Sequence, residues 1–242
     1  MVSVILRKPK SHWISYRMCK KLKKFSMKED QDQVHMREIN RLRDKWIEKV
    51  VEYVEAGEAV PENFIDFQWA LQLVDRLISC DHETIKSKKI KVWHSQLVWK
   101  PTSKGSSGNA GWHRDAQYWP LKPAKSVTVW LALYKTDEQN AAMKVVQGSH
   151  KEGKFKHHTN KASNLVLDQE VSKDQIKKED IVSLNLQAGE ISLHDDGLLH
   201  GSEANNSDRR RCGVTMRFAP VNVKADLSIW PHFETQLARG VD

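Results

Sequence analysis

The 242-residue sequence contains only three cysteines and no long run of apolar residues. Cys19, Cys80 and Cys212 are odd in number and widely spaced, which excludes a disulfide framework and indicates a reducing compartment. No apolar run approaches the ~18 residues of a membrane-spanning helix, and the apolar piece at 2–6 is shorter than the ~7 residues of a secretory signal core. We therefore expect an intracellular protein, cytoplasmic or organellar, with no membrane span.

Acidic residues are missing from the first 28 positions, which carry nine Lys or Arg. The formal charge of +8 arises there, because the remainder has 39 − 9 = 30 basic and 31 acidic residues, a net of −1. A neutral body does not favour a phosphate-binding face, so we expect no nucleic-acid partner. We expect residues 1–28 to form a basic, solvated and partly disordered arm. Organellar targeting and surface or nucleic-acid anchoring are the alternatives.

The apolar pattern changes along the chain from a helical to a strand period. Residues 29–56 and 62–78 carry apolar side chains every three or four positions, which predicts two amphipathic helices in a helical layer over 29–80. After Lys89, short β-rich runs are separated by polar clusters, at 90–99, 126–134, 143–146, 181–186, 190–195 and 212–218. This pattern predicts a mainly β fold with N-terminal helices, a sandwich or barrel, within one domain over 29–242.

The stretch "GWHRDAQYW" at 111–119 places His113 and Asp115 two positions apart among aromatic residues. In an extended chain both side chains point to one face, with Arg114 turned away. An aromatic-rich strand entering a core would explain this pair equally well. His200 lies in a Gly/Ser turn 200 − 115 = 85 residues further on. Two histidines and one carboxylate form the facial arrangement that binds non-haem Fe(II) and leaves three positions open.

An arginine and a serine follow His200 at short spacings. Arg211 comes eleven residues after it, at the start of a predicted strand, and its guanidinium fork matches a carboxylate co-substrate. Ser202 can add a hydroxyl donor to the same carboxylate. His194 is the competing ligand, although a position beside the ligands suits it better. Arg209 is the competing clamp, because it shares a strand face with Arg211.

The sequence resembles the phytanoyl-CoA dioxygenase family of Fe(II)/2-oxoglutarate oxygenases over roughly residues 90–220. The resemblance rests on the segments "WHRDAQYW" (112–119), "SVTVWLAL" (126–133), "MKVVQGSHKEG" (143–153) and "AGEISLHDDGLLHGSEANNS" (188–207), and on Arg211. It implies a double-stranded β-helix, the cupin-like jelly roll, with this core at 90–220. The implied site consists of the iron ligands His113, Asp115 and His200, the 2-oxoglutarate residues Arg211, Ser202, Trp130 and Lys100, and the substrate residues Trp119 and Tyr118.

The resemblance also implies a reaction, in which Fe(II), 2-oxoglutarate and dioxygen hydroxylate an aliphatic carbon of a small molecule. Relatives that halogenate have a small residue in place of the aspartate, so Asp115 favours hydroxylation. Lysines at 100, 122 and 125 and in the loop 148–158 are expected at the pocket mouth, which favours an anionic molecule or acyl conjugate. A Zn²⁺-dependent hydrolase with the same ligands and a non-catalytic jelly-roll binding module remain alternatives. The oligomeric state stays open.

Overall fold

The computed structural model describes residues 4–6, 44–45, 47–53, 55–56, 89–100, 108–153, 155–160 and 167–239. The chain divides into two compact units, one of Met1–Ile5 with Glu83–Asp242 and one of Leu6–His82. In the second unit the described residues between 44 and 56 are helical, as the sequence predicts, and Val50 is buried. The predicted helix at 62–78 lies outside the described residues. No described helix is long and apolar enough to cross a membrane.

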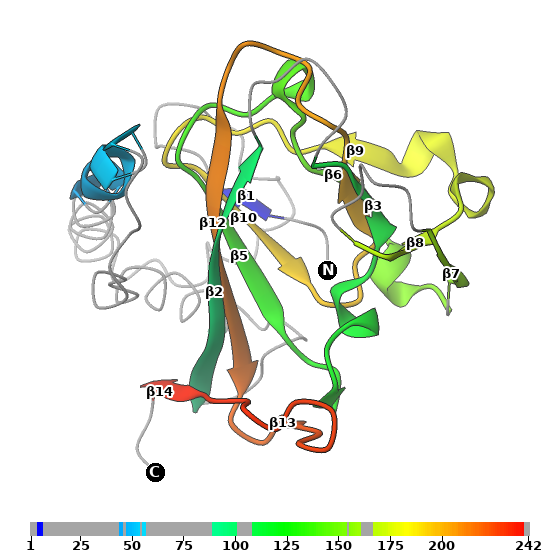
Figure 1. Cartoon of the computed structure of the whole chain (residues 1–242). Helices are drawn as coiled ribbons and strands as arrows, with labels where there is room; N and C mark the ends of the chain where they lie inside the picture. The colour runs from blue at the N-terminus through cyan, green and yellow to red at the C-terminus, as the bar shows by residue number, and fades with distance from the viewer. Residues whose placement is uncertain are drawn as a thin grey trace, which may run out of the picture. The chain divides into compact units, whose positions relative to one another are not determined.

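Two antiparallel sheets make up most of the first unit (Figure 1). The larger sheet has the order β1-β10-β5-β12-β2-β14, and its strands are Val4–Leu6, Ile191–Asp195, Val127–Ala132, Arg211–Pro220, Ile90–Lys100 and Gln236–Arg239. The smaller sheet has the order β3-β11-β6-β9, and its strands are Ala110–His113, His200–Ser202, Lys144–Val146 and Ile181–Ser183. Residues 4–6 of the expected basic arm therefore form an edge strand next to β10.

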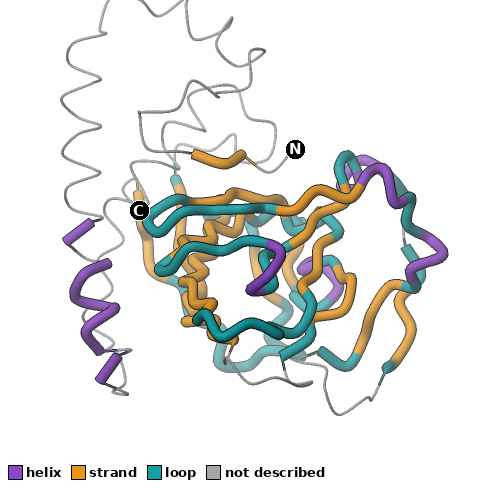
Figure 2. Tube along the Cα trace, turned by 90° about the horizontal axis from the view of Figure 1, so that it is seen from above, coloured by secondary structure: helices purple, strands orange, loops and turns teal. Residues whose placement is uncertain are grey.

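The chain crosses repeatedly between these sheets, because β2, β5, β10 and β12 belong to the larger one and β3, β6, β9 and β11 to the smaller one. This winding of eight strands is that of a double-stranded β-helix, and the predicted fold class is confirmed. Figure 2 shows that loops and short helical turns join the strands. The helical turns are η3 (Asp115–Gln117), η4 (Glu138–Asn140), η5 (Ser149–Lys151), η6 (Lys173–Gln175) and η7 (Lys178–Asp180). Two further two-stranded sheets belong to this unit. In one, β4 (Leu121–Lys122) pairs with β13 (Lys224–Ala225), and in the other β7 (His157–Thr159) pairs with β8 (Gln169–Val171).

The central strands β10, β5 and β12 of the larger sheet are buried on both faces, but the two faces differ in polarity. Every residue of β5 is buried, although its side chains alternate between the faces. On one face Leu131 lies opposite Ile191 of β10 and Val214 of β12, and all three are apolar and buried. On the other face Thr128 lies opposite His194 of β10 and Arg217 of β12. The polar face carries Thr128 and His194, which border the candidate site described below.

Candidate active site

Three short elements bring His113, Asp115 and His200 together. His113 ends β3, Asp115 begins the turn η3, and His200 begins β11. The strand that was expected to include Asp115 ends before it. Arg114 keeps an extended backbone, however, so both side chains still point to one side, and the Arg114 guanidinium turns away to the carbonyl of Gly153 at 3.0 Å. The HxD spacing therefore produces the predicted pairing by a strand followed by a turn.

His200 was expected in a Gly/Ser turn, and this expectation is wrong. Residues 200–202 form β11 because partners lie on both sides: His200 is opposite His113 of β3 and opposite Val145 of β6. Gly201 is needed here, since a Cβ at this position would meet the Ala110 carbonyl oxygen at 3.1 Å. The register between β3 and β11 thus sets the two histidines side by side.

The three side chains form a buried group that can hold a cation. The Nε2 atoms of His113 and His200 each lie 3.8 Å from Oδ1 of Asp115. One donor atom from each residue can be chosen so that all lie within 4.8 Å of one another. A separation of 3.8 Å is too long for a hydrogen bond, yet two such donors can both lie about 2.1 Å from one ion. Nitrogen and oxygen donors in a two-histidine, one-carboxylate set suit non-haem Fe(II).

Backbone carbonyls fix which nitrogen of each imidazole faces the centre. Nδ1 of His113 is 2.7 Å from the carbonyl oxygen of Gly111, and Nδ1 of His200 is 2.9 Å from that of Leu198. Each contact requires a proton on Nδ1, which leaves the Nε2 lone pair free in the neutral ring. This is the tautomer that a metal ligand needs, and the same bonds hold the ring planes in place.

The ionisation of the group also suits a metal. Burial lowers the pKa of His113, and burial together with His113 lowers that of His200 to about 3. Burial by itself would raise the pKa of Asp115, but His200, His194 and His113 around it bring the pKa well below its usual range. At neutral pH the centre therefore holds two neutral imidazoles and one carboxylate, all three in the state that binds a cation.

The second carboxylate oxygen of Asp115 has partners of its own. Thr128 Oγ1 lies 3.3 Å from Oδ2 and can donate to it, and His194 Nε2 lies 3.7 Å from the same atom. Both residues come from the polar face of the larger sheet, where they are opposite one another. His194 therefore approaches the other carboxylate oxygen, while its ring also lies against that of His200, with centroids 4.8 Å apart. This placement agrees with a supporting position beside the ligands.

Arg211 lies in the same body, at the start of β12. It is 3% exposed, and its guanidinium carbon lies 4.8 Å from the ring centre of Trp130. Among the described residues it forms no ion pair, and its buried Nε has no hydrogen-bond partner. Burial lowers its pKa to about 10. A buried guanidinium without a described acidic partner is the feature expected of a carboxylate site.

Lys100 lies directly opposite Arg211 in the β2–β12 register. It is 4% exposed, so it does not belong to a solvated rim at the pocket mouth. Its Nζ donates to the carbonyl oxygen of Ser202 at 3.2 Å and to that of Glu203. Burial and the charge of Arg211 lower its pKa to about 7. Two cationic side chains thus meet at this end of the sheet, beside the strand that carries Ser202.

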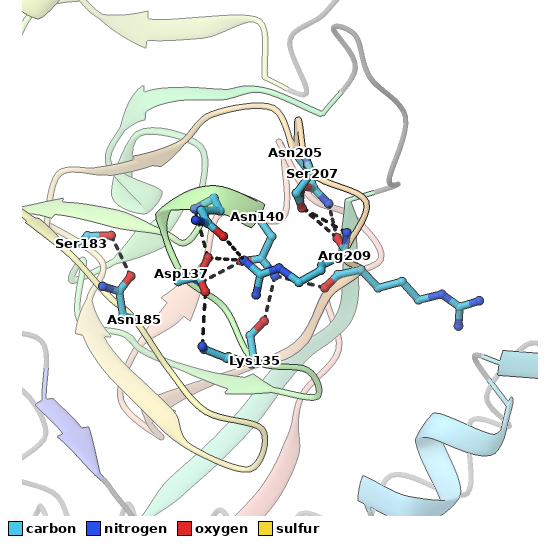
Figure 3. A network of polar contacts seen from close by, with 10 residues as sticks. Lys135, Asp137, Asn140, Ser183, Asn185, Asn205, Ser207 and Arg209 are labelled. Atoms are coloured by element: carbon cyan, nitrogen blue, oxygen red, sulfur yellow. Dashed lines mark hydrogen bonds and ion pairs between the residues drawn. The ribbon is translucent and has the colours of Figure 1, made fainter.

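Arg209, the competing clamp, has an acidic partner. Its Nη2 donates to Oδ1 of Asp137 at 2.6 Å, and the same carboxylate caps η4 by accepting from Gln139 N (Figure 3). Asn140 of that turn also donates to the Arg210 carbonyl oxygen at 3.2 Å. This network anchors the chain immediately before β12 and so fixes the position at which Arg211 enters the sheet. Arg209 therefore contributes to the loop, and of the two candidate clamps it is Arg211 that has no described acidic partner.

Gly213 provides the space that Trp130 occupies. A Cβ at residue 213 would lie 2.3 Å from Cζ2 of Trp130 and 2.7 Å from the Leu131 carbonyl oxygen. We expect Gly213→Ala to displace the ring and to lower the free energy of unfolding by about 1–3 kcal/mol in urea titrations. Gly153→Ala is the matched control, because nothing lies within 4 Å of a Cβ there. Equal stability of the two variants would contradict the packing described for Trp130.

Tyr118 and Trp119 follow the metal ligands but have different surroundings. The Tyr118 ring is edge-on to His113 with centroids 5.9 Å apart, and its hydroxyl donates to the Gln169 carbonyl oxygen at 2.6 Å. Burial raises the Tyr118 pKa to about 12. Trp119 packs edge-on against Trp93 at 4.8 Å. Tyr118 therefore borders the candidate metal centre directly, and Trp119 borders a neighbouring aromatic cluster.

The expected lysine rim is only partly present. Lys122, Lys125 and Lys156 are exposed, but Lys122 pairs with Asp226 at 3.1 Å. Lys154 lies outside the described residues. The paired Lys122 and the buried Lys100 weaken the argument for a positive pocket mouth.

A family model described as phytanoyl-CoA dioxygenase matches residues 9–213, most of the chain. The chain belongs to the phytanoyl-CoA dioxygenase family. The peroxisomal phytanoyl-CoA dioxygenase of Bos taurus is 27% identical over 146 residues, which are 58% of this chain and 42% of the relative. A Stutzerimonas stutzeri protein named as a probable alpha-ketoglutarate-dependent hypophosphite dioxygenase is 26% identical over 147 residues, 60% of this chain and 48% of that protein. The chain thus spans less than half the length of these relatives.

Solved structures support the same fold. The non-heme monooxygenase ThoJ in its apo form aligns with a TM-score of 0.58 at 23% identity, covering 84% of this chain and 76% of that one.

Three residues that the sequence interpretation did not single out support or border the candidate site. Thr128 donates to Asp115, Gly213 makes room for Trp130, and Arg217 lies opposite Thr128. Strand alternation from Arg211 along β12 was the sequence signal that could have found the last two.

Proposed function

We propose that this protein is a non-haem Fe(II)- and 2-oxoglutarate-dependent dioxygenase that hydroxylates an aliphatic carbon of a small, anionic organic molecule or acyl conjugate. The observation that carries the proposal is a buried two-histidine, one-carboxylate group in the same β-sheet body as a buried arginine with no described acidic partner. The first fits Fe(II), and the second fits the distal carboxylate of 2-oxoglutarate. The name of the Stutzerimonas relative, an alpha-ketoglutarate-dependent dioxygenase, supports the co-substrate.

In this proposal His113, Asp115 and His200 hold the iron on one side. The Nδ1 bonds to Gly111 and Leu198 keep both imidazoles directed at it. When bound, iron and 2-oxoglutarate supply the oxidising chemistry: 2-oxoglutarate is decarboxylated to succinate and CO2, with one oxygen atom of O2 entering succinate and the other a substrate C–H bond. The chain contributes positioning and the exclusion of water.

Arg211 binds the distal carboxylate through its guanidinium fork, with the Trp130 ring fixing the orientation of the fork. Ser202 adds a hydroxyl donor, and Lys100, whose pKa of about 7 leaves it partly protonated at neutral pH, adds positive charge from the opposite strand. Both act on the same distal carboxylate, because Lys100 lies opposite Arg211. Tyr118 and Trp119 lie on the substrate side. We retain the expected intracellular compartment as part of the proposal.

The decisive test is the stoichiometric release of succinate. We expect the purified protein to convert 2-oxoglutarate to succinate and CO2 only when Fe(II), dioxygen and 2-oxoglutarate are all present. Zn²⁺ in place of Fe(II) should abolish the release, because zinc has no redox chemistry. Succinate measured by mass spectrometry provides the readout. Hydrolysis with Zn²⁺ but no succinate with Fe(II) would favour a hydrolase, and tight binding of 2-oxoglutarate without turnover would favour a binding module.

A further inference from the structure

Strand β12 carries a second arginine on the same face as Arg211. The side chains of residues 211, 213, 215 and 217 point to one face, since successive side chains alternate along a strand. Arg217 lies opposite Thr128, which in turn lies opposite His194. Thr128 and His194 are the two residues that contact Oδ2 of Asp115. Arg217 therefore shares a cross-strand row with the residues that support the candidate metal ligand.

The surroundings of Arg217 hold the guanidinium but leave its charge without a dedicated partner. Its guanidinium carbon is 4.8 Å from the ring centre of Trp119 and 6.0 Å from that of Trp93. Nη1 can donate to Thr215 Oγ1 at 3.4 Å, and Nε is buried with no hydrogen-bond partner. Among the described residues Arg217 forms no ion pair. The residue as a whole is half-buried and keeps some exposure to solvent.

Asp115 is the acid whose charge acts on Arg217. Burial lowers the pKa of Arg217, and Asp115 offsets part of that effect. The Asp115 carboxylate, however, already faces His113 and His200 through Oδ1 and His194 through Oδ2. A metal bound by Asp115 would use this negative charge, so that Arg217 would keep no acid of its own among the described residues.

One anion cannot serve both arginines of β12. Six residues of extended chain separate Arg211 from Arg217, which places their backbones about 20 Å apart. Arg211 has Lys100 and Trp130 around it, and Arg217 has Trp93 and Trp119. The two guanidinium groups therefore belong to different subsites on one sheet face.

We propose that Arg217 binds an anionic group, a carboxylate or a phosphoryl group, of the organic substrate and so places a neighbouring aliphatic carbon at the candidate metal centre. This inference rests on the proposed function and specifies its substrate class and a residue that recognises it. The guanidinium fork offers paired donors to two oxygen atoms of either group. The tryptophans fix the orientation of the fork, and their rings border the aliphatic part of the substrate.

The test measures anion preference with the Arg211 subsite occupied. Protein loaded anaerobically with Fe(II) and saturating 2-oxoglutarate is titrated by calorimetry with hexanoate, hexylphosphonate and the neutral hexanamide. We expect the unchanged protein to prefer at least one of the two anions over hexanamide by about tenfold or more. Arg217→Gln should remove this preference without altering hexanamide binding, and Arg217→Lys should keep only part of it, since lysine lacks the fork. The tighter of the two anions distinguishes a carboxylate from a phosphoryl substrate.

Arg210→Gln is the matched control, because Arg210 is exposed and only seven residues away on the same chain segment; it should retain the full preference. No anion preference in the unchanged protein, or a preference that survives in Arg217→Gln, would overturn the inference. If Arg217→Gln does not fold, an undiminished anion preference in Arg217→Lys would overturn the inference instead. Succinate release by the unchanged protein is measured separately. Its absence alongside an Arg217-dependent preference would refute the proposed function while the anion subsite stands.

Discussion

His113→Ala, Asp115→Ala and His200→Ala should each leave a folded protein that binds no iron and releases no succinate. Each substitution removes one of three buried donors: both ring nitrogens lie 3.8 Å from one Asp115 oxygen, and all three donor atoms lie within 4.8 Å of one another. Two remaining donors leave the ion too open to be held at micromolar concentrations. The main strands β2, β5 and β12 do not include these residues, so the secondary structure should persist. Iron content by mass spectrometry and circular dichroism on the same samples measure both effects.

His194→Ala is the informative comparison, because this histidine lies near the other carboxylate oxygen of Asp115. Removing it takes away one neighbour of Oδ2 while Thr128 still donates to the same oxygen. Loss of a group that orients a ligand typically lowers metal affinity about 10- to 100-fold, so iron should still bind at higher concentration. An active His200→Ala protein together with an inactive His194→Ala protein would show that the ligand assignment is wrong.

The local motifs predicted more of this molecule than the long-range pairings did. The β-rich runs at 126–134, 190–195 and 212–218 contain β5, β10 and most of β12, because branched apolar residues alternate there with polar ones over short lengths. The HxD pair and the arginine eleven residues after His200 could be predicted from their spacing along the sequence. These features survive in any strand arrangement that keeps the chain extended, which explains why they could be read from the sequence.

Register was the information that the sequence did not contain. Thr128, His194 and Arg217 lie in one row only because β5 pairs with β10 and with β12 in a particular alignment. A shift of one residue would turn all of them to the other face. For the same reason Lys100, interpreted as a lysine near the pocket mouth, is buried opposite Arg211. His200 was assigned to a turn because neither of its strand neighbours is near it in sequence.

The cationic residues that support an anionic ligand also differ between sequence and structure, because strand register decides which of them are buried. Exposed lysines at 122 and 125 contribute little, because a solvated cation near the surface is screened and Lys122 already pairs with Asp226. Arg211 and Arg217 lie on a buried sheet face, where screening is weaker and an unpaired cation is more costly. The case for an anionic co-substrate and an anionic substrate therefore rests on two arginines of one strand.

Arg211→Lys should raise the apparent 2-oxoglutarate requirement roughly 10- to 100-fold, which corresponds to the loss of about 1.4–2.8 kcal/mol of binding free energy. Lysine keeps the positive charge but cannot offer two parallel donors or lie flat against Trp130, which now contacts the guanidinium at 4.8 Å. The loss should appear in calorimetric binding of 2-oxoglutarate to the iron-loaded protein as well as in the Michaelis constant. Arg209→Lys, the matched control, should bind 2-oxoglutarate normally, because Arg209 pairs with Asp137 at 2.6 Å on the η4 turn. An unchanged requirement in Arg211→Lys with a raised one in Arg209→Lys would transfer the carboxylate clamp to Arg209. The network before β12 would then have to open when the co-substrate binds.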